Sequence, residues 1–385
     1  MSQSLEDFAR GKLGALEQKQ LRRSLFDTER LEQAVTLRNG KKLISFACND
    51  YLNLSQHPEI KRAAIAATER YGVGSGASRL VTGNHPLFRE LESRLAELKG
   101  TDDACVFGSG YLANLGIIPT LIGPDDLLIA AELSHACILA AGTLTRARTF
   151  LFHHNDIEHA AQLLDEHRAS YAHTMLVTDG VFSMDGDLAP IEELGALAAE
   201  YDAWFMTDDA HGIGVLADGR GSSFLSGSKA AVPLQMGTLS KAIGGYGGYL
   251  CAAQPVIDLM RTRSRTFIYS TGLPPASVAA SIAALDLIKR EPAFAALPLE
   301  KARLFCRTLG LPEPESCIVP VLLGDPSRTL AASQLLETEG YLVTAIRPPT
   351  VPEGTARLRF TFTAAHEDHD IFRLAEIVKA RIMAS

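Results

Sequence analysis

Short apolar runs alternate with helical stretches through the middle of the chain. The run DACVF at 103–107 precedes the helical stretch 111–122, TMLVTDG at 174–180 precedes the helical stretch 191–201, and AWFMTDD at 203–209 follows it. Alternation of this kind predicts βαβ units and an α/β fold with a mostly parallel sheet flanked by helices. Ligands of such sheets bind at the carboxyl ends of the strands, so the polar residues that end these runs are the candidates for a functional site.

The length of the chain predicts more than one domain. With 385 residues, 46% of them hydrophobic, it can bury a large core. We expect an N-terminal helical arm with short strands at 1–48, a large domain at 49–288 and a small C-terminal α/β domain at 289–385. Prolines and a loss of period mark the last boundary at 289–300. In the small domain, ARLRFTFTA at 356–364 alternates as a strand, with Leu358, Phe360 and Phe362 on one face.

Composition disfavours several other classes of protein. A net charge of −8 disfavours a general nucleic-acid binder. The six cysteines lie far apart without a CxxC pair, so we expect neither a metal site nor a secreted disulfide framework. The N-terminus lacks the apolar core of a signal peptide, and no stretch is long enough to span a membrane. We therefore expect a cytoplasmic protein with no membrane or nucleic-acid partner.

The segment FGSGYLAN at 107–114 is a candidate anion site. Gly108 and Gly110 follow a strand and open a helix, where free backbone N–H groups can bind an anion. The spacing from Gly108 to Ala113 also fits the GxGxxA pattern of dinucleotide folds, although no clean acidic residue ends the next strand. A single phosphate, a pyrophosphate and a plain tight turn all remain compatible with the segment.

The segment TDDAHG at 207–212 places two more polar residues at a strand end. Asp208 and His211 follow the apolar run 204–206. Alone, Asp208 could be a helix N-cap and His211 a structural histidine. A carboxylate at the base of a pocket would, however, hold a heteroaromatic nitrogen in its protonated form.

Lys241 lies in TLSKAIGGYGG at 238–248, among small residues and glycine pairs and without the charged neighbours of a solvated helix face. Most lysines are surface residues, but a desolvated lysine has a lowered pKa and can form an imine. A phosphate cradle, a strand-end aspartate and a glycine-flanked lysine, in this order, predict a pyridoxal phosphate site without a metal.

The chain resembles the α-oxoamine synthases, fold-type I pyridoxal phosphate enzymes that condense an amino acid with an acyl-CoA and release carbon dioxide. The resemblance runs nearly end to end, through CNDYLNLS, GSGASRLVTGNH, SHAC, TDGVFSMDGD, DDAHGIGV, TLSKAIGGYGG and YSTGLPP. The segment TAIRPPTVPEGTARLRFTFTAAHE is most similar to the member that joins L-alanine to pimeloyl-CoA, or to a pimeloyl-carrier protein, in biotin biosynthesis. The resemblance implies a PLP-dependent acyltransferase and a homodimer with shared active sites.

For the cofactor, the resemblance implies a role for each matching residue. Lys241 would bind it as an imine, Asp208 would pair with the pyridine nitrogen, His211 would hydrogen-bond the ring hydroxyl, and His135 of SHAC would stack on the ring. These four residues form the expected catalytic set. The remaining cofactor contacts would come from Gly110, Tyr111, Thr238 and Ser183, and from Ser270 and Thr271 of the partner subunit.

For the substrates, the resemblance implies that Arg359, together with Asn49 of the partner subunit, holds the amino-acid carboxylate. The residues alone favour another interpretation, in which Arg359 shares the exposed face of an alternating strand with Arg357. Arg347, in the loop RPPTVP, could contact the acyl chain or could simply belong to a pair of proline turns. Arg22 and Thr350 complete the expected substrate contacts.

Other hypotheses need other sequence features. Glycine C-acetyltransferase (2-amino-3-ketobutyrate CoA ligase), 5-aminolevulinate synthase and serine palmitoyltransferase share the mechanism and differ in substrates. A regulatory binding module of the same fold would lack the lysine or the aspartate, and an NAD dehydrogenase would carry a full dinucleotide fingerprint. The chain departs from the family at Tyr111, where phenylalanine is common, and next to Lys241, where SKA replaces the commoner GKG or SKS.

Overall fold

A computed structural model of the chain describes residues 2–19 and 21–384. Its largest sheet has seven strands in the order β4-β10-β9-β8-β7-β5-β6. All neighbours are parallel except β10, which runs antiparallel to both β4 and β9, so the predicted mostly parallel sheet is confirmed. The strands are β4 (Asp103–Phe107), β5 (Leu127–Ala131), β6 (Arg148–Phe152), β7 (Thr174–Asp179), β8 (Trp204–Asp208), β9 (Leu234–Thr238) and β10 (Gly248–Ala252).

Helices cover both faces of this sheet, which explains why its strands read as continuous apolar runs. Alternate residues of β5 enter different apolar clusters: Leu128 packs with one set of helices, and Leu127 and Ile129 pack with another. One face carries α4 (Gly110–Leu121), α5 (Ala136–Thr145), α8 (Gln254–Arg263) and α9 (Arg265–Ile268). The opposite face carries α3 (Leu87–Lys99), α6 (Ile157–His167), α7 (Ile191–Glu200) and α10 (Pro275–Arg290), with α2 (Pro58–Tyr71) against α10.

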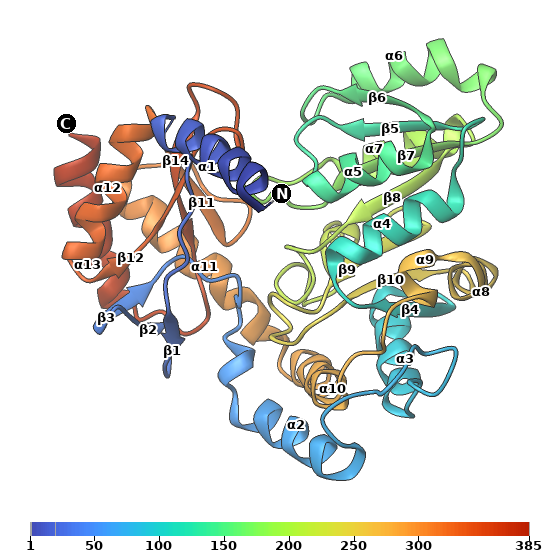
Figure 1. Ribbon diagram of the computed structural model, residues 1–385, viewed down its shortest axis with the longest axis horizontal. Coiled ribbons are helices and arrows are strands. Elements are labelled where there is room, and N and C mark those ends of the chain that lie inside the picture. Colours follow the sequence, from blue (N-terminus) through green and yellow to red (C-terminus); the bar gives the residue numbers. More distant parts are fainter. Residues whose placement is uncertain (1, 20, 385) are drawn as a thin grey trace.

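The C-terminal region forms a second layer beside the large sheet (Figure 1). Its antiparallel sheet has the order β11-β14-β13. The strands are β11 (Ile318–Gly324), β13 (Thr344–Ile346) and β14 (Ala356–Thr361), and the helices are α11 (Pro292–Leu309), α12 (Pro326–Thr338) and α13 (Asp368–Val378). The described part of the chain also contains four short 3-10 or π helices, three before the C-terminal region and one at its end: η1 (Leu54–Gln56), η2 (Arg168–Ser170), η3 (Ser222–Phe224) and η4 (Lys379–Met383). Leu358, Phe360 and Phe362 are buried, as the alternation predicts.

The N-terminal strands pair with the C-terminal region rather than with the large sheet. A four-stranded sheet has the order β1-β2-β3-β12, and β3 runs parallel to β12. Its strands are β1 (Thr28–Arg30), β2 (Val35–Arg38), β3 (Lys41–Ser45) and β12 (Tyr341–Leu342). The strands between residues 28 and 45, which belong to the proposed N-terminal arm, therefore share a sheet with the proposed small domain. The proposed boundary at 288/289 lies next to the break between α10 and α11.

The first helix, α1 (Ser2–Gln18), stands apart from these layers. Its apolar side chains Leu5 and Phe8 are 69% and 62% exposed, so within one chain the helix does not pack its apolar residues on a larger body. No helix among residues 2–19 and 21–384 is long and apolar enough to cross a membrane.

Candidate active site

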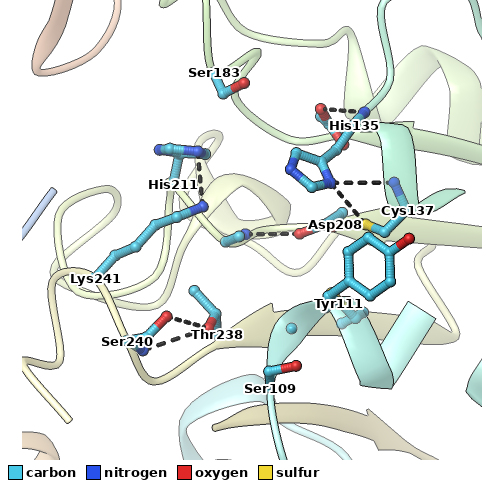
Figure 2. Close-up of a pocket in the computed structure, with 14 residues that line it drawn as sticks. Ser109, Tyr111, His135, Cys137, Ser183, Asp208, His211, Thr238, Ser240 and Lys241 are labelled. Carbon is cyan, nitrogen blue, oxygen red and sulfur yellow. Dashed lines mark hydrogen bonds between the residues drawn. The ribbon is translucent and has the colours of Figure 1, made fainter. Parts of the chain in front are cut away.

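A cavity of about 200 Å³ lies where β7, β8 and β9 end and α4 begins. Figure 2 shows side chains from these elements converging on it. It is lined by Ser109, Gly110, Tyr111, His135, Cys137, Asp179, Ser183, Asp208, Ala210, His211, Met236, Thr238, Ser240 and Lys241. Parallel strands bring their carboxyl ends to one edge, so residues that are more than 100 positions apart in the chain meet here.

One wall is the start of α4. Ser109 caps the helix, because its hydroxyl accepts a hydrogen bond from the Leu112 N–H at 3.1 Å. A Cβ on Gly110 would lie 3.3 Å from Thr238 Cβ, so the absence of a side chain lets the helix start approach the end of β9 closely. The first N–H groups of a helix have no partner within it, and Gly110 and Tyr111 of this first turn line the cavity.

Asp208 lies at the base of the cavity and is buried. The Asn114 amide, from the second turn of α4, donates to its Oδ2 at 2.7 Å, and the Ala210 N–H donates to its Oδ1 at 3.0 Å. Asp179 is its register neighbour on β7. Burial and then the charge of Asp208 raise the pKa of Asp179 well above its ordinary value, so the Asp179 carboxyl group readily holds a proton.

Lys241 reaches into the cavity from the loop after β9. Its Nζ lies 2.7 Å from His211 Nε2, and the other ring nitrogen, Nδ1, lies 2.6 Å from the Tyr51 hydroxyl. Burial lowers the pKa of Lys241 to about 8, against the opposing effect of Asp208 and Asp179. Burial, followed by the nearby Lys241 charge, lowers the pKa of His211 well below its ordinary value, so the imidazole is neutral.

His135 forms the wall opposite Lys241 in Figure 2. It is the N-cap of α5, and its Nδ1 accepts a hydrogen bond from the Cys137 N–H at 3.3 Å. Burial lowers the pKa of His135 and raises that of the Cys137 thiol to about 12, so both groups are neutral at pH 7. A neutral imidazole ring fixed at a helix start offers a flat surface to a planar ligand.

Arg359 is buried, because β14 is the central strand of its sheet and both of its faces are covered. Its Nε donates to the Ser183 carbonyl at 2.5 Å, and its guanidinium donates to Asn49 Oδ1 at 3.1 Å. The interpretation of an exposed strand face is therefore wrong, also for Arg357, which is buried and paired with Asp185. Asn49 of the same chain makes this contact, whereas the resemblance implies that Asn49 of the partner subunit helps to hold the substrate carboxylate.

Other expected residues lie outside this cavity. Neither Ser270 nor Thr271 lines the cavity of its own chain, and Thr271 forms an isolated bridge with Ser78. Arg22 is exposed and paired with Glu17 at 3.0 Å. Arg347 and Thr350 lie on the loop after β13, where the Thr350 N–H donates to the Arg347 carbonyl at 3.0 Å.

Comparison with known proteins identifies the family. Residues 41–378 match the family model "Aminotransferase class I and II". The chain is 64% identical to 8-amino-7-oxononanoate synthase of Methylocella silvestris, over 89% of this chain and 98% of that one, and 58% identical to the protein of the same name from Beijerinckia indica, over 97% of each. It belongs to the 8-amino-7-oxononanoate synthase family.

A solved structure supports the fold and the cofactor of this family. A serine palmitoyltransferase variant from S. paucimobilis, with a bound PLP–myriocin aldimine, superposes with a TM-score of 0.90 at 28% identity, over 99% of this chain and 98% of that one. The protein is thus a fold-type I, PLP-dependent acyltransferase, as the sequence predicts.

The residues of this family member fit pyridoxal phosphate. The glycine start of α4 can bind a phosphate, the buried Asp208 carboxyl group can pair with a ring nitrogen, and Lys241 offers an amine of lowered pKa. Sequence reasoning missed Tyr51, Asn114 and Asp179. All three stand inside the quoted motifs CNDYLNLS, GYLAN and TDG, but their roles depend on partners far away in the chain.

Proposed function

We propose that the chain condenses L-alanine with a pimeloyl thioester. A bond forms between the alanine Cα and the acyl carbon, the thiol leaves, and the alanine carboxylate departs as carbon dioxide, which gives 8-amino-7-oxononanoate. The observation that carries the proposal is the Lys241 amine, held 2.7 Å from His211 in a cavity with Asp208 at its base. The names of relatives at 58–64% identity support this acyl acceptor and donor over those of other α-oxoamine synthases.

Pyridoxal phosphate, when bound, supplies an electron sink for the negative charge that develops at Cα. Lys241 would hold its aldehyde carbon, the N–H groups of Gly110 and Tyr111 together with Thr238 its phosphate, and Asp208 its ring nitrogen. Asn114 keeps one oxygen of Asp208 in place, so the carboxylate stays oriented toward the cavity. His135 would stack on the ring, and His211 and Ser183 would lie near the ring hydroxyl.

Lys241 is suited to move the Cα proton. A pKa of about 8 leaves a sizeable neutral fraction at physiological pH, so the amine can accept a proton from Cα and later return one to the product. The desolvation that lowers this pKa also removes competing water from the amine.

Arg359 is suited to hold the alanine carboxylate. Its planar guanidinium can bind a carboxylate with two hydrogen bonds, and its contacts with the Ser183 carbonyl and with Asn49 fix the direction in which it points. Arg22, Arg347 and Thr350 are proposed contacts of the acyl donor at the rim. A homodimer, with Ser270 and Thr271 of the partner subunit at the phosphate, is part of the proposal.

Thiol release tests the assignment. The PLP-loaded protein is given L-alanine with pimeloyl-CoA, L-alanine with pimeloyl-carrier protein, and glycine with acetyl-CoA, and the free thiol is measured. Release with either pimeloyl donor and not with glycine and acetyl-CoA is expected. Release with the glycine pair alone would keep the mechanism but overturn the substrate assignment in favour of glycine C-acetyltransferase.

A further inference from the structure

Tyr51 is a fully buried tyrosine whose hydroxyl contacts the site from behind. It lies in the segment after β3, and its ring packs in the apolar core that joins the two parts of the molecule. The hydroxyl lies 2.6 Å from His211 Nδ1, the nitrogen that faces away from Lys241. His211 is therefore held from both sides, by a phenol at one nitrogen and by an amine at the other.

The surroundings of Tyr51 indicate which way its hydrogen bond runs. The Arg359 guanidinium, which can only donate, faces the hydroxyl and leaves the phenol oxygen to accept. The one competing acceptor among the described residues, Asn49 Oδ1, lies at 3.4 Å and already accepts from Arg359. Burial raises the pKa of Tyr51, so the hydroxyl keeps its proton and can donate it to His211 Nδ1.

We propose that Tyr51 is a positioning residue that sets the tautomer of His211. Its O–H donates to Nδ1, so the ring hydrogen is carried by Nε2, which faces Lys241 and the cavity. If the proposed function holds, on which this consequence rests, the Nε2–H becomes a fixed donor for the ring hydroxyl of pyridoxal phosphate. The opposite tautomer would present a lone pair there instead.

The charged groups around Tyr51 and His211 define the pH range in which His211 holds this tautomer. Lys241, Arg359 and His135 face His211 and oppose its protonation, while Cys48, Cys317 and Arg359 face Tyr51. Below its pKa of about 8, Lys241 becomes an ammonium in the cofactor-free protein. The ammonium can only donate, so it favours the opposite tautomer, in which Nε2 carries a lone pair. The tautomer is therefore best measured above that pH.

The first test uses the unmodified, cofactor-free protein. Nitrogen-15 spectra of the labelled histidines are recorded about one pH unit above the Lys241 pKa, and the His211 signals are assigned by their loss in His211→Gln. We expect a protonated Nε2 and an unprotonated Nδ1 that accepts a hydrogen bond. A protonated Nδ1 overturns the proposal, whatever the substrates of the enzyme are.

The second test removes the hydroxyl. In Tyr51→Phe we expect both His211 tautomers and, with the cofactor loaded, a kcat lower by roughly tenfold at an almost unchanged KM for alanine. Tyr249→Phe is the matched control, since that tyrosine is also fully buried in the same core but its hydroxyl has no hydrogen-bond partner among the described residues. It should keep the His211 tautomer and the kcat of the unmodified protein.

The outcomes separate this inference from the proposed function. An unchanged single tautomer in Tyr51→Phe overturns the inference even if thiol release occurs with pimeloyl-CoA. Silence with every acyl donor, together with the expected spectra, overturns the proposed function and leaves the tautomer assignment standing. If Tyr51→Phe does not fold, the spectra of the unmodified protein alone decide the matter.

Discussion

The burial of Lys241 sets the reactivity of its amine. Only the neutral amine attacks an aldehyde, and its pKa of about 8 means that the neutral form appears between pH 7 and 9 rather than near 10.5. We expect the rate at which the cofactor-free protein forms an imine with added pyridoxal phosphate to rise with pH through about 8 and then level off. Stopped-flow absorbance of the imine measures this rate.

Lys241→Ala is the control for that experiment. It should give no imine absorbance at any pH and should lower thiol release by about 10³-fold or more, because both the imine and the proton carrier are lost. A rate that keeps rising up to pH 10 would show that the lysine is not desolvated as the structure has it.

Arg359 tests the proposed recognition of the alanine carboxylate. In Arg359→Lys a point charge replaces the planar fork, so two parallel hydrogen bonds are no longer possible. We expect KM for alanine to rise by about tenfold or more, with the affinity for pyridoxal phosphate unchanged. Steady-state kinetics and cofactor titration measure the two quantities, and an equal loss in both would assign Arg359 to the cofactor instead.

At the level of elements, α4 joins the two ends of the proposed cofactor site. Its first turn forms the phosphate cradle, and one turn later Asn114 donates to Asp208 on β8. Asn114→Leu keeps the branched shape of the side chain but removes a hydrogen bond to a buried carboxylate, which costs about 1.5–3 kcal/mol. We expect the dissociation constant of pyridoxal phosphate to rise by roughly ten- to a hundredfold, as measured by equilibrium dialysis.

A double-mutant cycle decides whether Asn114 acts through Asp208. The effect of Asn114→Leu should largely disappear when Asp208 is already alanine. An undiminished effect in the Asp208→Ala background would assign Asn114 to the packing of α4 alone.

The elements also show what the sequence could and could not predict. The strands before Gly108, Gly180 and Asp209 were predictable, because buried parallel strands are apolar and end in polar residues at the ligand edge. The burial of Arg359 was not, since alternation within one strand cannot tell that the loop at 183–187 covers its second face. The contact between Tyr51 and His211 joins residues 160 positions apart, and no local pattern encodes it.

At the scale of the whole molecule, the pairing of the N-terminal strands with the C-terminal region is also not encoded by any local sequence pattern. The two-residue contact between β3 and β12 is too short to leave a periodic signal in the sequence. His366 reinforces this junction: its Nε2–H donates to the Ser45 carbonyl at 3.0 Å, and its ring stacks on Phe46 at 3.9 Å. A side chain from near the C-terminus thus holds the end of β3.

His366 also predicts a loss of stability in acid. Burial lowers its pKa to about 3, against 6.5 in an unfolded chain. Between these values the unfolded state binds the extra proton, so the free energy of unfolding falls as pH falls, by up to about 1.4 kcal/mol per pH unit. Urea unfolding at several pH values should show a shallower dependence in His366→Gln. The same replacement at the exposed His369 is the control for the loss of a histidine outside the core.

The assembly supplies the last prediction. Ser270 and Thr271 lie outside the cavity of their own chain, and the neighbouring Tyr269 is 74% exposed, as a residue covered by a second subunit would be. We expect a homodimer by sedimentation equilibrium. A variant with Ser270→Ala and Thr271→Ala should bind pyridoxal phosphate weakly, since the phosphate of the cofactor would lose two hydroxyl donors.

Mixing that variant with Lys241→Ala separates shared sites from independent ones. In a mixed dimer, the Lys241→Ala chain would lend its intact hydroxyl groups to the neighbour that still has the lysine, so one of the two sites becomes fully native. Refolding the two inactive variants together should therefore restore thiol release at low cofactor concentration, whereas either variant refolded alone should not. If dimers form but activity does not return, the phosphate is bound entirely within one chain, and the shared-site proposal is wrong.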